Sequence, residues 1–200
     1  MARALYGLTA IAAIAGIILQ GSITVRQLGL MPGLWSLAAY FTEWTNALVV
    51  LVAGASALAP TSWLAKSRFR IMMLVAISIV GMVYSLALRA VMPDDLGMLL
   101  AGSIQHDVVP LLFILAWIVG PHGRTDGRLL GWIIAWPLTF LAAMLLRGIL
   151  TDWYPYWFID PAIVGPVDAV LGGASVLIAF VVLGILALWA ERALARRSAF

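Results

Sequence analysis

The chain has 200 residues, of which 64% are hydrophobic and only 10% are charged, and its mean hydropathy is +1.07. A soluble domain carries roughly 25% charged residues, so this composition indicates a protein whose solvent is lipid. The chain contains no cysteine, which excludes disulfides, cysteine nucleophiles and thiolate-bound metal or iron–sulfur centres.

Six apolar stretches are long enough to cross about 30 Å of hydrocarbon. In chain order they cover approximately residues 5–25, 34–58, 71–92, 96–119, 129–150 and 161–189. Because the segments between them are short, consecutive helices are expected to be antiparallel neighbours. We therefore predict an all-α integral membrane protein in which residues 1–200 form a single transmembrane bundle of six helices.

Basic residues are divided unequally between the two ends of these helices. Nine of the 12 lysines and arginines fall at one end, and only Arg26, Arg89 and Arg147 fall at the other. The positive-inside rule predicts that the basic end is cytoplasmic, together with both termini. Basic residues in short loops orient a membrane protein and form no stripe for nucleic acid, so no nucleic-acid partner is expected. The outer end carries the aromatic run 153–158, which is typical of a membrane interface or of a cavity rim.

Polar side chains inside the predicted spans gather in the outer half of the membrane. Such groups are costly in lipid and usually face a cavity or one another. Thr42 lies about eight residues from the outer end of its span, or ~12 Å at 1.5 Å per residue, and His106 lies at a similar depth. The same two spans and the third, fifth and sixth carry further polar residues: Glu43, Thr45, Asn46, Tyr84, Arg89, Ser103, Asp107, Arg147 and Asp168. We infer a polar cavity that opens towards the outer leaflet.

A histidine beside a hydroxyl in a water-poor pocket is able to support nucleophilic acyl transfer. His106 would act as the general base for Thr42, whose oxygen would attack an ester carbonyl and form an acyl-enzyme. Backbone N–H groups inside a helix are already bonded, so the sequence predicts side chains as oxyanion donors or positioning groups. The candidates are Asn46, Thr45, Ser103, Tyr84 and Arg147.

The polar partner of His106 is open at this point. Asp107 is rotated by about 100° from His106 around the helix, so Glu43 or Asp168 on another helix is the better candidate among the three carboxylates. Pro110, four residues after His106, frees the histidine's carbonyl from its helical hydrogen bond.

Structural interpretations compete with these roles. A threonine in a membrane helix commonly bonds a carbonyl one turn earlier, and Asn46 is able to join two helices. Asp168 is able to form an ion pair with Arg147 or Arg89. His122 is interpreted as a solvated cytoplasmic residue. Only one histidine lies within a span, which argues against bis-histidine haem and histidine-rich metal sites, so no cofactor or metal is predicted.

Three short motifs resemble a known family: 40–46 (YFTEWTN), 106–113 (HDVVPLLF) and 154–160 (YPYWFID). Their order and spacing are similar to those of the androgen-induced and androgen-dependent TFPI-regulating protein family, especially its bacterial six-span members. The resemblance implies an intramembrane threonine hydrolase that cleaves fatty acid esters of hydroxy fatty acids, with Thr42 as nucleophile and His106 as the essential histidine. It also implies a bacterial inner membrane. Animal members tend to carry an aspartate where this chain has Thr45 and Asn46.

The sequence thus predicts a membrane-embedded hydrolase of ester-linked lipids that takes its substrate from the outer leaflet. One alternative is a small-molecule or proton-coupled transporter with a relay of ionisable side chains, namely His106, Asp107, Glu43 and Asp168. Another is a non-catalytic lipid-binding protein. A hydrolase requires Thr42 Oγ1 within hydrogen-bond reach of His106 beside an acyl-sized slot, whereas a transporter requires broken helices or an aqueous path to the cytoplasm. The oligomeric state is left open.

Overall fold

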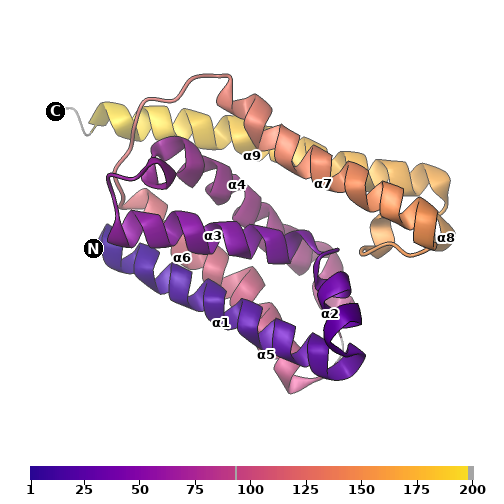
Figure 1. The fold of residues 1–200 in the computed structure, drawn as a ribbon. Helices are drawn as coiled ribbons and strands as arrows, with labels where there is room; N and C mark the ends of the chain where they lie inside the picture. Colours follow the sequence, from indigo (N-terminus) through magenta and orange to yellow (C-terminus); the bar gives the residue numbers. More distant parts are fainter. Residues whose placement is uncertain (93, 198–200) are drawn as a thin grey trace.

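The computed structural model describes residues 1–92 and 94–197, and the regular secondary structure of these residues is helical. Six helices are long and apolar enough to cross a membrane: α1 (Ala2–Leu28), α3 (Phe41–Leu58), Ser67–Val91, Leu96–Ile118, α7 (Leu129–Thr151) and α9 (Pro166–Arg197). They confirm the prediction of an all-α integral membrane protein with six spans. Both termini lie at the same end of the bundle (Figure 1).

The predicted second span, 34–58, consists of two helices. The helix α2 covers Leu30–Leu37, and α3 begins only at Phe41, after a short link that ends in the extended residue Tyr40 (φ −100°, ψ 123°). Thr42 therefore lies in the first turn of α3 and not two turns inside a continuous helix. The link contains neither glycine nor proline, so no residue in it marks the break.

Two other spans change helix type along their length. The third is made of α4 (Ser67–Val83), the π-helical turn η2 (Tyr84–Leu88) and the 3-10 turn η3 (Arg89–Val91). The fourth is made of α5 (Leu96–Ser103), the π-helical turn η4 (Ile104–Val108) and α6 (Val109–Ile118). Pro110 has no N–H to donate to the carbonyl of His106. That carbonyl instead lies against Gly81, where an added Cβ would be only 2.7 Å from its oxygen.

The predicted sixth span, 161–189, is also divided. The short helix α8 (Pro161–Val164) ends at Gly165, whose φ of +85° suits glycine, and α9 then runs on to Arg197. Two 3-10 turns complete the described elements, η1 (Trp63–Ala65) before α4 and η5 (Trp157–Ile159) before α8.

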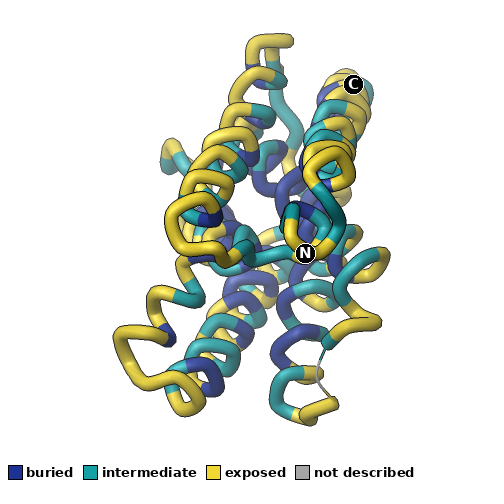
Figure 2. The backbone as a smooth tube through the Cα atoms, turned by 90° about the vertical axis from the view of Figure 1, so that its right-hand side faces the viewer, coloured by how far each residue is buried: buried dark blue, intermediate teal, exposed yellow. Residues whose placement is uncertain are grey.

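The helix α4 occupies the centre of the bundle. It packs against α3 and α6 on one side and against α7 and α9 on the other, and Figure 1 shows α7 and α9 as a pair set apart from α1 and α3. The α4 side chains Ile71, Val75 and Ile77 are at most 1% exposed. Buried residues gather between the helices, as Figure 2 shows in dark blue.

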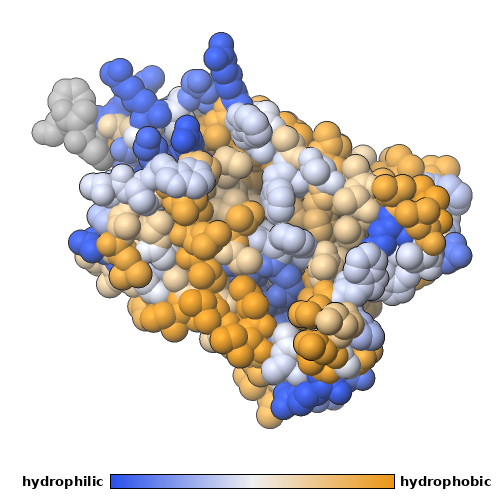
Figure 3. Space-filling view, in the orientation of Figure 1, coloured by the Kyte–Doolittle hydropathy of each residue, from blue (hydrophilic) through white to orange (hydrophobic). Residues whose placement is uncertain are grey.

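The outside of the bundle is apolar between two polar ends. Figure 3 shows hydrophobic residues over much of the surface, with hydrophilic residues concentrated towards the ends of the helices. Large apolar side chains such as Ile18, Leu51 and Leu146 are more than half exposed. A contiguous surface of this kind is not stable in water, but it is the surface that a lipid bilayer requires.

The interpretation of His122 as a solvated residue is wrong. Its side chain is 4% exposed, and its Nδ1 lies 2.8 Å from the carboxylate of Glu191, which is 1% exposed. The same carboxylate accepts hydrogen bonds from Trp117 Nε1 and from the backbone N–H of Gly123, each at 2.9 Å. This network fastens the loop after α6 to the last helix. The sequence alone does not predict this network, because Glu191 lies 69 residues after His122 in the chain.

Candidate active site

Thr42 and His106 meet between the first turn of α3 and the π-helical turn η4. Thr42 Oγ1 lies 3.2 Å from His106 Nε2, although 64 residues separate the two in the chain. Thr42 is 9% exposed. The spacing is within hydrogen-bond reach, which is the geometric condition that a nucleophile and its base must meet.

The backbone determines which nitrogen of His106 carries the proton. His106 Nδ1 lies 2.8 Å from the carbonyl oxygen of Gly102. A carbonyl oxygen only accepts hydrogen bonds, so Nδ1 is the donor. The neutral ring then has its lone pair on Nε2, which accepts the hydroxyl proton of Thr42. The imidazole is therefore oriented as a base by a main-chain carbonyl, and neither Glu43 nor Asp168 is its partner.

Tyr84 holds the imidazole from one side. The two rings are stacked, with centroids 4.1 Å apart and planes 17° from parallel. The guanidinium of Arg89 lies 4.7 Å from the centroid of the Tyr84 ring and forms an ion pair with Asp107. Asp107 thus binds Arg89 and not His106, in agreement with its predicted rotation away from the histidine. Tyr84 thus fixes the orientation of the His106 ring, and its hydroxyl lies against Gly102 of α5.

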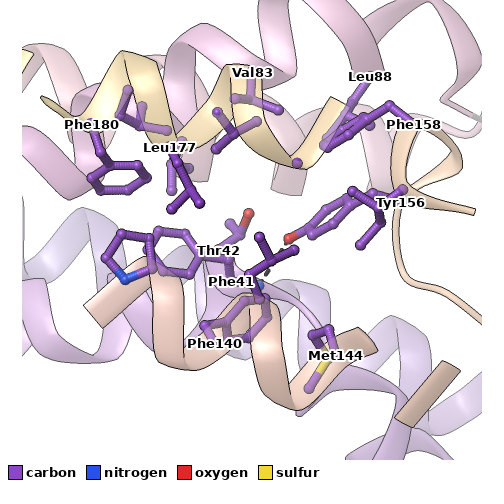
Figure 4. A pocket seen from close by; sticks show the side chains of 17 residues that line it. Phe41, Thr42, Val83, Leu88, Phe140, Met144, Tyr156, Phe158, Leu177 and Phe180 are labelled. Carbon is purple, nitrogen blue, oxygen red and sulfur yellow. Dashed lines mark hydrogen bonds between the residues drawn. The ribbon is translucent and has the colours of Figure 1, made fainter. Parts of the chain in front are cut away.

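Tyr156 is the residue of this site that the sequence did not reveal. Its hydroxyl accepts a hydrogen bond of 2.9 Å from the backbone N–H of Phe41, the first residue of α3. In Figure 4 the hydroxyl of Tyr156 points towards Thr42. Because the Phe41 N–H occupies one lone pair of the phenol oxygen, the phenolic proton is free to be donated on the Thr42 side. Burial raises the pKa of Tyr156, so the hydroxyl stays protonated at neutral pH.

The loop that carries Tyr156 is fixed at several points. Trp157 Nε1 donates a hydrogen bond of 3.0 Å to the carbonyl of Ala87 in the π-helical turn η2. The rings of Tyr156 and Phe158 are stacked with centroids 5.4 Å apart. The backbone carbonyl of Phe158 packs so closely on α9 that a Cβ added at Gly172 would lie 2.1 Å from its oxygen. The run 153–158 is therefore part of the cavity rim, one of its two predicted interpretations.

The first turn of α3 also supplies a backbone donor. The amides of the first four residues of a helix have no acceptor within the helix, and the positive end of the helix dipole lies there. The amide of Glu43 bonds the carbonyl of Tyr40 and that of Phe41 bonds Tyr156. The amide of Thr42 has no such partner among the described residues. The premise that every backbone N–H near Thr42 is already used is therefore wrong, because α3 begins later than predicted.

Two cavities meet at Thr42. The first has a volume of about 70 Å³ and lies between α3, α4, α7, α9 and the loop that carries Tyr156. Thr42 and Tyr156 contribute the only hydroxyl groups among the described residues that line it. Its other walls are apolar, as Figure 4 shows for the following side chains: Phe41, Val83, Leu88, Phe140, Met144, Phe158, Leu177 and Phe180. This apolar lining suits an acyl chain.

The second cavity, of about 420 Å³, lies on the other side of Thr42. Thr42, Leu88 and Tyr156 line both cavities, whereas His106 lines only the second. Several polar side chains face this second space: Gln20, Thr24, Gln27, Ser36, Tyr40, Glu43 and Gln105. Thr42 thus lies where an apolar cavity joins a polar one, with His106 on the polar side.

The remaining predicted site residues lie away from the reacting atoms. Thr45 and Asn46 are fully buried and are absent from the described walls of both cavities, although Asn46 Nδ2 donates to the carbonyl of Thr42 at 3.0 Å. Ser103 ends α5 and is likewise absent from the described walls of both cavities. Arg147 lies between the rings of Trp35 and Trp153. Asp168 is exposed in the first turn of α9, and the ion pair of Arg89 is with Asp107 instead.

The described residues contain no group of three or more histidine, cysteine, aspartate or glutamate side chains that is able to hold a metal ion. Comparisons of the chain with protein-family models, with curated proteins and with solved structures found no match. Function is therefore argued from the residues of the site and their geometry.

Proposed function

We propose that this chain is a membrane-embedded hydrolase of ester-linked lipids, with Thr42 as nucleophile and His106 as general base. Fatty acid esters of hydroxy fatty acids belong to this substrate class. The observation that carries the proposal is the Thr42 Oγ1 to His106 Nε2 contact of 3.2 Å at the junction of an apolar cavity and a polar one.

The reaction begins when His106 Nε2 takes the hydroxyl proton of Thr42. The threonine oxygen attacks the ester carbonyl carbon, and a tetrahedral oxyanion forms. When the oxyanion collapses, the bond from carbon to the alcohol oxygen breaks, and the leaving alcohol takes the proton from His106 Nε2. Water then attacks the acyl-threonine with His106 again as base. The fatty acid leaves, and the Thr42 hydroxyl is restored.

Two donors are proposed to stabilise the oxyanion. The first is the hydroxyl of Tyr156, which faces Thr42 and is itself held by the N–H of Phe41. The second is the amide of Thr42 in the first turn of α3, where the helix dipole favours negative charge. Donors fixed in advance in a water-poor site contribute more than donors that must reorient during the reaction.

The surroundings support a lipid as substrate. The apolar cavity lies within a bundle whose outer surface is itself apolar, so an acyl chain is able to move from the bilayer into the slot with little loss of hydrophobic burial. With the basic loops in the cytoplasm, as the positive-inside rule predicts, the site opens to the outer leaflet. The resemblance to bacterial six-span members of the androgen-induced and androgen-dependent TFPI-regulating protein family adds a bacterial inner membrane to this proposal.

The breaks in the second and sixth spans meet one of the two structural conditions for a transporter, but the proton relay that it would need receives less support from the side chains. In such a relay, ionisable groups are expected to follow one another within hydrogen-bond reach. Asp107 is paired with Arg89, Asp168 is exposed on α9, and Glu43 is bonded by Gln105. None of these three carboxylates contacts His106 among the described hydrogen bonds and ion pairs.

The test is labelling of the purified protein with a fluorophosphonate probe, followed by mass spectrometry of the modified peptide. We expect wild-type protein to be labelled on Thr42, and the Thr42→Ala and His106→Ala variants to remain unlabelled. Thr45→Ala is the matched control, because Thr45 lies one turn further along α3 and is absent from the described walls of both cavities. Melting temperatures in detergent would check that each variant is folded. Labelling that persists without Thr42 would refute the proposed nucleophile.

A further inference from the structure

The first helix contributes a polar stripe that the proposed reaction does not use. Gln20, Thr24 and Gln27 follow one another at helical spacing near the outer end of α1, and all three line the polar cavity. Gln20 Nε2 donates a hydrogen bond of 3.2 Å to Thr24 Oγ1. Amide side chains in a membrane helix are costly unless they face polar partners, so this stripe indicates that the cavity receives a polar occupant.

Glu43 and Gln105 also line the chamber. Gln105 Nε2 lies 3.2 Å and 3.4 Å from the two carboxyl oxygens of Glu43. Gln105 is held close to α1, because a Cβ added at Gly16 would lie 2.6 Å from its Cγ. These residues directly follow Thr42 and precede His106 in the chain, so the pair lies beside the reacting groups. A group that fills the chamber therefore lies next to the Thr42 hydroxyl and is able to belong to the ester that Thr42 is proposed to attack.

The chamber contains a carboxyl group but no cation. None of its described lining residues is lysine or arginine. The basic residues of the outer half have other partners: Arg89 pairs with Asp107, Arg147 lies against two tryptophan rings, and Arg26 donates to the carbonyl of Ser22. Burial raises the pKa of Tyr40, another lining residue, so its phenol stays neutral.

We infer that the polar cavity binds the uncharged, hydroxyl-bearing alcohol half of an ester lipid, as in an acylglycerol. This inference rests on the proposed function, because it names the substrate class of the same site. Hydroxyl groups donate to the carboxyl oxygens of Glu43 and to the amide oxygens of the glutamines, and they accept from the amide nitrogens.

A carboxylate or phosphate in the same place would lose its hydration without gaining a cation, and it would face the acceptor oxygens of Glu43. The family resemblance implies a different substrate, a fatty acid ester of a hydroxy fatty acid. The alcohol half of that lipid carries a carboxylate, which would lie in this chamber or beyond it. Such lipids should therefore be poorer substrates than neutral acylglycerols. Phospholipids should be excluded for the same reason.

Binding of two matched ether lipids tests the inference without requiring turnover. The probes are 1-O-hexadecylglycerol and 3-O-hexadecylglycerate, in which a terminal CH₂OH is replaced by a carboxylate. Isothermal titration of wild-type protein in neutral detergent at pH 7.5 should give at least about tenfold tighter binding of the glycerol ether. The Glu43→Gln variant, which keeps the size and one acceptor oxygen, should reduce this ratio. Equal affinities in wild-type protein, tighter binding of the glycerate or no binding of either ether would overturn the inference.

Hydrolysis separates this inference from the proposed function. Cleavage of para-nitrophenyl palmitate that depends on Thr42, together with equal turnover of 1-palmitoylglycerol and palmitoylglycerate, would overturn the head-group selectivity and leave the hydrolase standing. Selective binding of the glycerol ether without fluorophosphonate labelling or ester cleavage would have the opposite meaning: the chamber would keep its specificity in a protein that binds lipid without cleaving it.

Discussion

Replacement of Tyr156 by phenylalanine removes one oxygen atom from the site and leaves the ring in place. The lost hydroxyl faces Thr42 and holds the N–H of Phe41 at 2.9 Å. Loss of a single preorganised oxyanion donor lowers kcat by about 10²–10³, which corresponds to about 3–4 kcal/mol of transition-state stabilisation. Because the donor acts on a charge that exists only in the transition state, KM should change little.

The assay is steady-state hydrolysis of para-nitrophenyl palmitate by wild-type and variant protein in the same detergent. Tyr154→Phe is the matched control: it makes the same chemical change two residues away in the same loop, where the ring packs against Gly148. Equal melting temperatures of Tyr154→Phe and Tyr156→Phe would show that the loop is intact in both. If Tyr156→Phe kept kcat within about threefold of wild type, or if the loss appeared in KM alone, the oxyanion role would be refuted.

Three further perturbations follow from the contacts of the site and the bundle. Gly172→Ala should displace the Tyr156 loop and lower kcat, because the new Cβ would meet the carbonyl of Phe158. Gly131→Ala is the control, and it should not change kcat because the space around Gly131 is open. Equal kcat values of the two variants would contradict the close packing at Gly172. Glu191→Ala should lower stability by about 3–5 kcal/mol because it leaves buried donors unpaired, and melting curves should show no comparable loss for the exposed neighbour Arg192→Ala. Burial raises the pKa of Tyr156, so its hydroxyl stays a donor through alkaline pH. The pH profiles of kcat for wild type and Tyr156→Phe should therefore have the same shape below about pH 10. A decrease in this range that is present in wild type and absent from Tyr156→Phe would contradict the raised pKa.

The sequence was sufficient to predict six helices that are able to span a membrane. Apolar runs of about 20 residues have few alternatives to a membrane helix, and all six are present. The sequence also predicts Thr42 and His106 at one level, and they are in contact, although the residue count behind that prediction treats 34–58 as one continuous helix, whereas α3 begins at Phe41. Depth does not give rotation about the helix axis. Arg147 and Asp168 share that level approximately, yet the first packs on tryptophan rings and the second is exposed on α9.

The sequence does not predict the role of Tyr156, because this role depends on a loop that folds back onto the start of α3. It lies 115 residues after Phe41, inside an aromatic run that is equally typical of a membrane interface. The sequence also does not predict that the Thr42 amide is available as a donor. The apolar stretch from 34 to 58 predicts a continuous helix. The non-helical link before Phe41 contains no glycine or proline, so nothing in the sequence indicates that Thr42 lies in the first turn of a helix.

Departures from regular helix are concentrated around the Thr42–His106 pair. The link before α3, the π-helical turn η2 with Tyr84, the π-helical turn η4 with His106 and the loop with Tyr156 all converge there. In a membrane, irregular backbone is tolerated only where it is buried in protein or lines a cavity, because lipid satisfies none of its polar groups. Helix packing alone does not require irregular backbone in these four segments. The irregular backbone instead frees a helical amide, turns an imidazole towards a hydroxyl and opens a space on each side of Thr42, which is the combination that acyl transfer needs.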